Sequence, residues 1–298
     1  MAVMQAHASD GYIEWDGHRT YYRIFGEQSS SKVPLLVLQG GPGSAHNYML
    51  GFARLAGDRQ VVFFDQLGGG LSDHPDDDSL WSIDVCVREV QAVREQLGLD
   101  EIHLVGHSWG GMLAIEYMLT EPQGVHSVTL ASTMISMPLY QQEVELLKRD
   151  LPEDIYRTLI ECEQAGKTDS DMYKQAYVEY KKRHIWRGGA FPSEYDDPEG
   201  TYGQSKYETM WGKSEAYADG TLCTWDRIQD LSRIKIPCLI TSGQYDELTP
   251  NQAVITHDHI AHSRLRIFTA GSHCAHIEFE DEYMSVMTEF LRQVDGMH

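Results

Sequence analysis

The sequence predicts an α/β fold in which a mostly parallel central sheet carries helices on both faces. Short apolar runs typical of buried strands alternate with helical patterns along most of the chain. Between residues 135 and 224 this alternation stops, and polar helical stretches rich in Glu, Lys, Tyr and Trp replace it. A Gly-x-Ser-x-Gly motif at 106–110 stands between a predicted strand and a predicted helix. We therefore predict a sheet domain made of residues 1–134 and 225–298, with a helical lid inserted over 135–224.

Each element of the sheet domain has a local signal of its own. Two β-rich runs, 12–15 and 21–25, flank Asp16-Gly17, a dipeptide that favours a tight hairpin turn. The apolar runs at 34–38 and 61–65 predict buried strands, and further strands are expected at 102–105, 125–132, 236–242 and 265–268. Helical spacing and composition predict helices, which are expected at 47–55, 82–97, 112–119 and 282–294.

The composition argues against several classes of partner. The chain has 24 Lys and Arg against 45 Asp and Glu, a formal charge of −21, so nucleic acid and anionic membranes would repel it. No apolar run approaches the ~20 residues of a membrane span, and residues 1–10 lack the pattern of a signal peptide. Five scattered cysteines without a Cys-x-x-Cys pair indicate reduced thiols in a cytoplasmic protein rather than disulfides or zinc.

Ser108 is the candidate nucleophile. It occupies the centre of the Gly-x-Ser-x-Gly motif, and a strand–turn–helix arrangement around such a serine is a nucleophile elbow. The turn crowds the backbone, so side chains at Gly106 or Gly110 would collide with neighbouring elements. The amides at the start of the following helix point at the same place and favour a developing oxyanion.

A serine hydroxyl needs a base, and the base needs a carboxylate that orients it. In this kind of fold the order along the chain is Ser, then acid, then His. Asp246 follows a predicted strand and is the candidate acid, while His273 follows the last strand and is the candidate base. His276 competes with His273 for that role. His107, next to the nucleophile, is expected to support the turn.

Two further features need an interpretation. The loop Gln39-Gly40-Gly41-Pro42-Gly43 brings bare backbone close to a ligand, and no Gly-Lys-Ser/Thr follows that would make it a P-loop. Its place after an early strand favours a second oxyanion donor. Histidines at 257, 259 and 262 have a spacing similar to a metal cluster, but their position favours a solvated helix. We predict no metal site and no organic cofactor, because a serine mechanism needs neither.

In combination these motifs resemble the proline iminopeptidase family of α/β-hydrolases, which includes the tricorn-interacting aminopeptidases. The similarity covers nearly the whole chain. The matching stretches are 39–43, 65–72, 106–111, 180–187, 212–215, 243–250 and 271–273. The resemblance implies an α/β-hydrolase fold with an inserted lid.

The resemblance also implies roles for individual residues. It implies Ser108, Asp246 and His273 as the catalytic triad, and the backbone amides of Gly41 and Trp109 as the oxyanion hole.

The same resemblance implies that Glu247 and the lid residue Glu215 hold the free α-ammonium of the substrate. The sequence departs from the family pattern at Gln39, because the family's loop usually begins with His. Gln can form hydrogen bonds but cannot titrate. A different substrate range is therefore expected.

The expected function is that of a serine hydrolase that forms an acyl-enzyme. It would release N-terminal amino acids, proline being one candidate, from short peptides, or hydrolyse amino-acid amides. One alternative is an esterase or lactonase acting on small uncharged substrates, for which Glu215 and Glu247 would have no use. Another is an inactive α/β-hydrolase that binds a ligand, and the complete Ser, Asp and His set argues against it.

Overall fold

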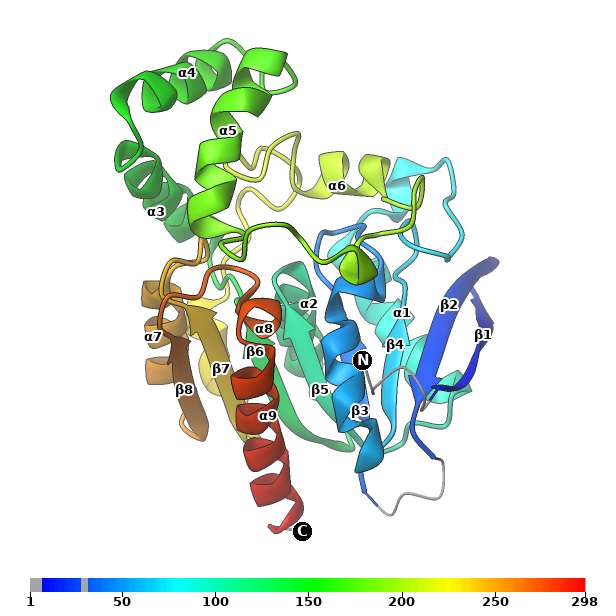
Figure 1. The fold of residues 1–298 in the computed structure, drawn as a ribbon. Helices are drawn as coiled ribbons and strands as arrows, with labels where there is room; N and C mark the ends of the chain where they lie inside the picture. Colours follow the sequence, from blue (N-terminus) through cyan, green and yellow to red (C-terminus); the bar gives the residue numbers. More distant parts are fainter. Residues whose placement is uncertain (1–6, 28–31, 298) are drawn as a thin grey trace.

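An eight-stranded sheet forms the centre of the computed structural model, which describes residues 7–27 and 32–297 (Figure 1). The strands stand in the order β1-β2-β4-β3-β5-β6-β7-β8. Their bounds are His7–Trp15 (β1), His18–Phe25 (β2), Leu35–Leu38 (β3), Val61–Phe64 (β4), Ile102–His107 (β5), Val125–Ala131 (β6), Cys238–Gly243 (β7) and Ser263–Phe268 (β8). The pairings β1–β2 and β2–β4 are antiparallel and all others are parallel. The predicted mostly parallel sheet is confirmed.

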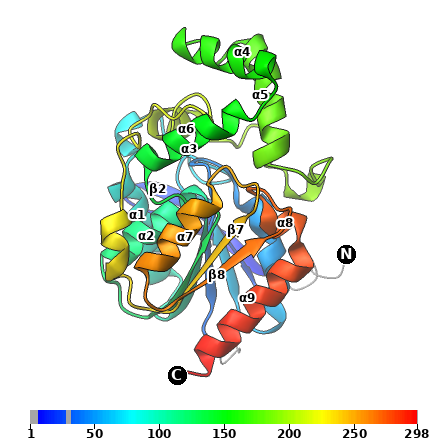
Figure 2. The ribbon, with the colours of Figure 1, turned by 90° about the vertical axis from the view of Figure 1, so that its left-hand side faces the viewer.

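Helices cover both faces of the sheet (Figure 2). Leu36 and Leu38 of β3 pack into one apolar cluster with α1 (Ile83–Gln96) and α2 (Trp109–Leu119). Leu35 and Val37, which alternate with them and so face the other side, pack with η2 (His46–Gly57) and α9 (Glu280–Asp295). Among the described residues of the sheet domain, the remaining helices are η3 (Asp78–Leu80), η5 (Ile228–Arg233), α7 (Pro250–His259) and α8 (Ala275–Glu278).

Most local predictions agree with these elements to within a few residues, and one needs correction. The segment predicted as a helix over 47–55 is helical, but it forms a 3-10 helix, η2, and not an α-helix. The N-terminal hairpin turns at Asp16 and Gly17, which both have positive φ, 49° and 82°. This is the backbone that a tight two-residue hairpin requires.

Most of the chain between β6 and β7 forms a helical layer above the carboxyl edge of the sheet (Figure 1). It contains α3 (Met137–Arg149), α4 (Glu153–Gln164), α5 (Asp171–His184), η4 (Ser193–Tyr195) and α6 (Gln204–Met210). Lys206 of α6 is only 1% exposed and donates a hydrogen bond of 2.8 Å to the carbonyl of Leu67. We call this helical layer the lid, and we propose that it extends over residues 135–224.

None of the helices in the described ranges has both the length and the apolar character that a membrane span requires. The five cysteines all lie within those ranges, and none of them forms a disulfide.

Candidate active site

Ser108 lies in a sharp turn between β5 and α2. Its φ of 56° and ψ of −124° are unusual for a residue with a side chain. The neighbouring glycines are required by space: a Cβ at Gly106 would collide with the carbonyl of Gly110, and a Cβ at Gly110 with the carbonyl of Leu38. The turn therefore packs directly against the end of β3, and the structure supports the elbow predicted from the sequence.

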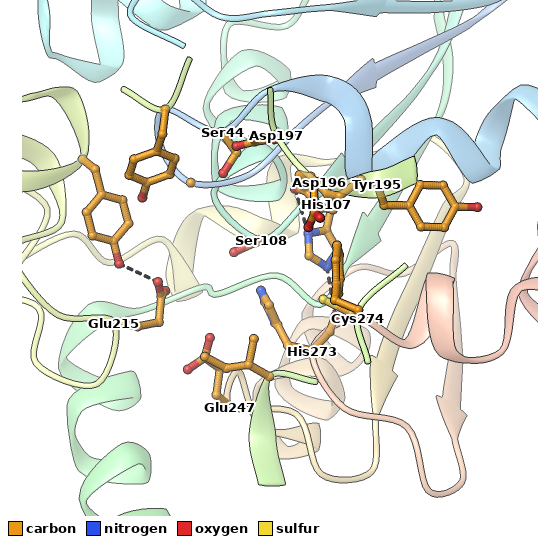
Figure 3. A pocket seen from close by; sticks show the side chains of 16 residues that line it. Ser44, His107, Ser108, Tyr195, Asp196, Asp197, Glu215, Glu247, His273 and Cys274 are labelled. Carbon is orange, nitrogen blue, oxygen red and sulfur yellow. Dashed lines mark hydrogen bonds between the residues drawn. The ribbon is translucent and has the colours of Figure 1, made fainter. Parts of the chain in front are cut away.

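His273 and Asp246 come from loops at the same edge of the sheet, after β8 and β7. The Nδ1 of His273 donates to Oδ1 of Asp246 over 2.9 Å, because a carboxylate can only accept. The Nε2 of His273 is then the basic nitrogen, and the ring points toward Ser108 (Figure 3). Burial disfavours the imidazolium, but the charge and hydrogen bond of Asp246 outweigh it and raise the pKa of His273.

The competing histidine, His276, is not among the residues that line the cavity in front of the serine. It is 2% exposed, and its Nε2 lies 3.3 Å from the carbonyl of Tyr48, to which it donates. Burial lowers the pKa of His276 to about 3. His276 is therefore placed as a neutral packing residue.

His107 connects the elbow to its surroundings, in line with the supporting role predicted for it. Its Nε2 donates to the carbonyl of His273 over 2.9 Å, and its Nδ1 accepts from the hydroxyl of Tyr48 over 3.1 Å. The Tyr48 hydroxyl in turn accepts the amide of Gly40 over 2.5 Å. Burial, with His276 and His273 close by, holds the pKa of His107 well below its usual range, so the ring stays neutral.

A cavity of about 310 Å³ opens in front of Ser108, beneath the lid (Figure 3). Ser108, His273, Gly41, Glu215 and Glu247 all line it, so five of the seven predicted site residues share one space. Asp246 lies behind His273, and Trp109 begins α2 directly after the nucleophile.

The two glutamates differ in their surroundings. Glu247 is 1% exposed, and its Oε2 has no hydrogen-bond partner within the described part of the chain. Burial, with Glu215 and Asp246 nearby, raises the pKa of Glu247 well above 4.5. Glu215 comes from the lid, and its Oε2 accepts a 2.5 Å hydrogen bond from the hydroxyl of Tyr207. Burial also raises the pKa of Glu215.

Sequence reasoning missed a second acidic segment on the opposite side of Ser108, formed by Asp196 and Asp197 from the lid (Figure 3). Asp197 accepts the amide of Ala45 over 3.1 Å, and burial raises its pKa to about 6. None of the described residues that line the cavity is Lys or Arg. The cavity is therefore suited to cations. No local pattern distinguishes these aspartates from the many surface acids of the chain.

The histidines at 257, 259 and 262 do not form a metal site. Nδ1 of His259 donates to the carbonyl of Ile255 within α7, and His257 pairs with the hydroxyl of Ser263. Within residues 7–27 and 32–297, no group of three or more His, Cys, Asp or Glu has the arrangement that a metal ion needs.

The sheet, the elbow and the histidine–aspartate pair together define an α/β hydrolase. A family model described as alpha/beta hydrolase fold matches residues 33–280. A proline iminopeptidase of Heyndrickxia coagulans is 37% identical over 287 residues, covering 96% of this chain and 99% of the relative. A proline iminopeptidase of Clostridium botulinum is also 37% identical, over 294 residues, with the same coverage of both chains.

Two solved structures support the same family. The crystal structure of a Mycobacterium smegmatis proline iminopeptidase is 33% identical with a TM-score of 0.88, covering 96% of this chain and 99% of that one. The crystal structure of VinJ is 31% identical with a TM-score of 0.90, covering 97% and 99%. The chain belongs to the proline iminopeptidase family. The predicted fold class and the predicted family of serine aminopeptidases are thereby confirmed.

Proposed function

We propose that this protein removes the N-terminal residue from short peptides, or hydrolyses amino-acid amides, with Ser108 as its nucleophile. The observation that carries the proposal is the shared cavity. It brings the serine and the Asp246-oriented His273 together with two buried glutamates that can receive an ammonium group. The unpaired cysteines support a reducing compartment, and we keep the cytoplasm as the proposed place of action.

In the proposed reaction, Oγ of Ser108 attacks the carbonyl carbon of the first residue while Nε2 of His273 takes its proton. Asp246 holds the ring in the required tautomer and stabilises the imidazolium. The negative oxygen of the tetrahedral intermediate accepts from the amides of Gly41 and Trp109. His273 then protonates the leaving amine as the C–N bond breaks. Water, deprotonated by His273, hydrolyses the acyl-enzyme and regenerates Ser108.

Glu247 and Glu215 are the proposed partners of the substrate ammonium. Two carboxylates in one buried space repel each other: burial is the main reason that the pKa of Glu247 is raised, and the charge of Glu215 raises it further. A cation placed between them removes the repulsion and gives the unpartnered Oε2 of Glu247 a donor. An N-terminal proline has two N–H donors on its ammonium group, one for each glutamate, and the name of the relatives supports proline as one substrate residue.

The test is a panel of aminoacyl-arylamides and amino-acid amides, with proline among the acyl groups. Each substrate is run beside its N-acetylated form and beside a simple acetyl ester. The proposal predicts that acetylation lowers kcat/KM by at least about tenfold, because an amide nitrogen cannot carry the charge that the glutamates hold. Equal rates on free and acetylated substrates would instead support the esterase alternative.

A further inference from the structure

A single buried side chain, Gln66, touches the segments that carry both proposed oxyanion donors. Its Oε1 accepts the indole N–H of Trp109 over 2.8 Å, and its Nε2 donates to the carbonyl of Gln39 over 2.9 Å. All three residues are 1% exposed. Because the indole nitrogen can only donate and the carbonyl can only accept, the orientation of the Gln66 amide is determined. We infer that Gln66 is a positioning residue that keeps the Gly41 and Trp109 amides at the spacing the oxyanion needs.

The Gly41 side of the oxyanion hole depends on such support. Gly41 has a φ of 111°, and neither Gly40 nor Gly41 has a side chain whose packing could fix the backbone. Hydrogen bonds to the preceding peptide do this instead. Gln66 holds the carbonyl of Gln39, and the Tyr48 hydroxyl holds the amide of Gly40. The Gln39–Gly40 peptide plane is thus held from both ends, one residue before the peptide that carries the Gly41 donor.

The Trp109 side of the proposed oxyanion hole is held by the same glutamine, Gln66. Trp109 is the first residue of α2 and follows the nucleophile directly. Gln66 accepts a hydrogen bond from the buried indole of Trp109 and donates one to the carbonyl of Gln39. The position of Trp109 is thereby linked to that of the Gln39–Gly40 peptide. The Gln39 side chain adds a weaker link within the loop, since its Nε2 lies 3.4 Å from the carbonyl of Ser44.

This inference rests on the proposed function, and it predicts a particular kinetic signature. Loss of an oxyanion donor lowers kcat by about 10²- to 10³-fold in serine proteases. A donor that is misplaced but still present should lower kcat less than a missing one. We therefore expect Gln66→Met to lower kcat by about 10- to 100-fold, with KM within about threefold of the wild type. KM should be preserved because Gln66 does not contact Glu215 or Glu247, the proposed partners of the substrate ammonium.

The experiment compares three single variants and one double variant. Gln66→Met keeps the length of the side chain and removes both hydrogen bonds. Trp109→Phe removes the indole donor together with part of the buried ring and leaves Gln66 in place, and it carries the test if Gln66→Met does not fold. The matched control is Gln252→Met, because Gln252 is 0% exposed and also bridges two partners, the amide of Ile135 and the carboxylate of Glu143, outside the cavity.

The readouts are Tm, kcat, KM and the inhibition constant of an α-aminoboronic acid, which adds to the serine and places an oxygen in the oxyanion hole. In Gln66→Met, the inhibition constant should rise by about the same factor as kcat falls. Gln252→Met should lower Tm while leaving kcat within about twofold. The double variant Gln66→Met/Trp109→Phe should be no slower than Gln66→Met, because both changes break one bridge.

An unchanged kcat in a folded Gln66→Met would overturn the inference, and so would the pattern expected of the control, in which Tm falls while kcat stays within about twofold. Failure of the proposed function would look different: Ser108→Ala would then retain its activity. If Ser108→Ala is inactive and Gln66→Met is normal, only the positioning role is wrong.

Discussion

Replacing Glu247 by Gln should distinguish recognition of the substrate amine from general support of the active site. The substitution keeps the shape of the side chain and removes its ability to become negative. Glu247 is 1% exposed, and its Oε2 has no other partner in the described part of the chain. The neighbouring Tyr180 hydroxyl is neutral, and none of the described residues that line the cavity is Lys or Arg. No cationic side chain at the cavity therefore replaces the contact that the substrate ammonium would lose.

The size of the loss follows from that contact. A hydrogen bond to a charged group contributes about 1.5–3 kcal/mol. At 1.4 kcal/mol per tenfold, kcat/KM for a free-amine substrate should fall by about 10- to 150-fold. Hydrolysis of an acetyl ester, which has no ammonium group, should change by less than about threefold.

The assay is the ratio of kcat/KM on a prolyl-arylamide to kcat/KM on the ester. The matched control is Glu89→Gln, because Glu89 is also fully buried, has an unpartnered Oε2 and has its pKa raised by burial, but lies outside the cavity. The control should leave the ratio unchanged. Equal losses on both substrates in Glu247→Gln would refute recognition of the amine by this residue.

The same variant should be stabilised at higher pH. Burial, with Glu215 and Asp246, raises the folded-state pKa of Glu247 above 4.5, so the folded protein keeps a proton that the unfolded chain releases. The wild type therefore loses stability as pH rises from about 4.5 through the folded pKa, whereas Gln does not titrate. The Tm of Glu247→Gln minus that of the wild type should be near zero at pH 4 and increase with pH. A constant difference would contradict the raised pKa.

Three further predictions follow from the cavity. His273→Ala should lower kcat by about 10⁴-fold or more, by analogy with the loss of other triad members, whereas His276→Ala should lower it by less than tenfold; the reverse order would make His276 the base. Because the pKa of His273 is raised above 6.5 and the base must be neutral, kcat/KM should rise through a pH above 6.5. A free-amine substrate should lose activity again at alkaline pH as its ammonium deprotonates, and an ester should not; identical profiles would count against a bound ammonium. A C-terminally amidated dipeptide should be hydrolysed at least about fivefold faster than the free acid, since two carboxylates about 4 Å apart repel by about 1 kcal/mol even in water and Asp196 and Asp197 line the cavity. Faster hydrolysis of the free acid would contradict this.

Local patterns were sufficient for most of the fold. Central strands such as β3 and β4 are buried along their whole length, so they occur as unbroken apolar runs. The elbow could also be predicted, because the collisions that require glycine at Gly106 and Gly110 arise from the turn itself and its nearest neighbours. The 3-10 form of η2 could not be predicted, because its apolar spacing is similar to that of an α-helix.

The candidate site was predictable only in part, because much of it depends on long-range contacts. Glu215 lies more than 100 residues from Ser108 in the sequence, and only resemblance to a family indicated a role for it. The bridge through Gln66 joins residues 27 and 43 positions away. No periodicity or spacing rule relates such residues. Asp197 reaches the cavity because the lid folds back over Ala45, which the sequence of an acidic loop does not reveal.

The central claim is that Ser108 is the nucleophile of an aminopeptidase, and covalent labelling tests it most directly. The protein is treated with a fluorophosphonate, digested, and the modified peptide is located by mass spectrometry. We predict one label per chain, on Ser108, formed much more slowly in His273→Ala and prevented when a free-amine substrate is present in excess. A label on another residue, or none on a folded protein, would contradict the account.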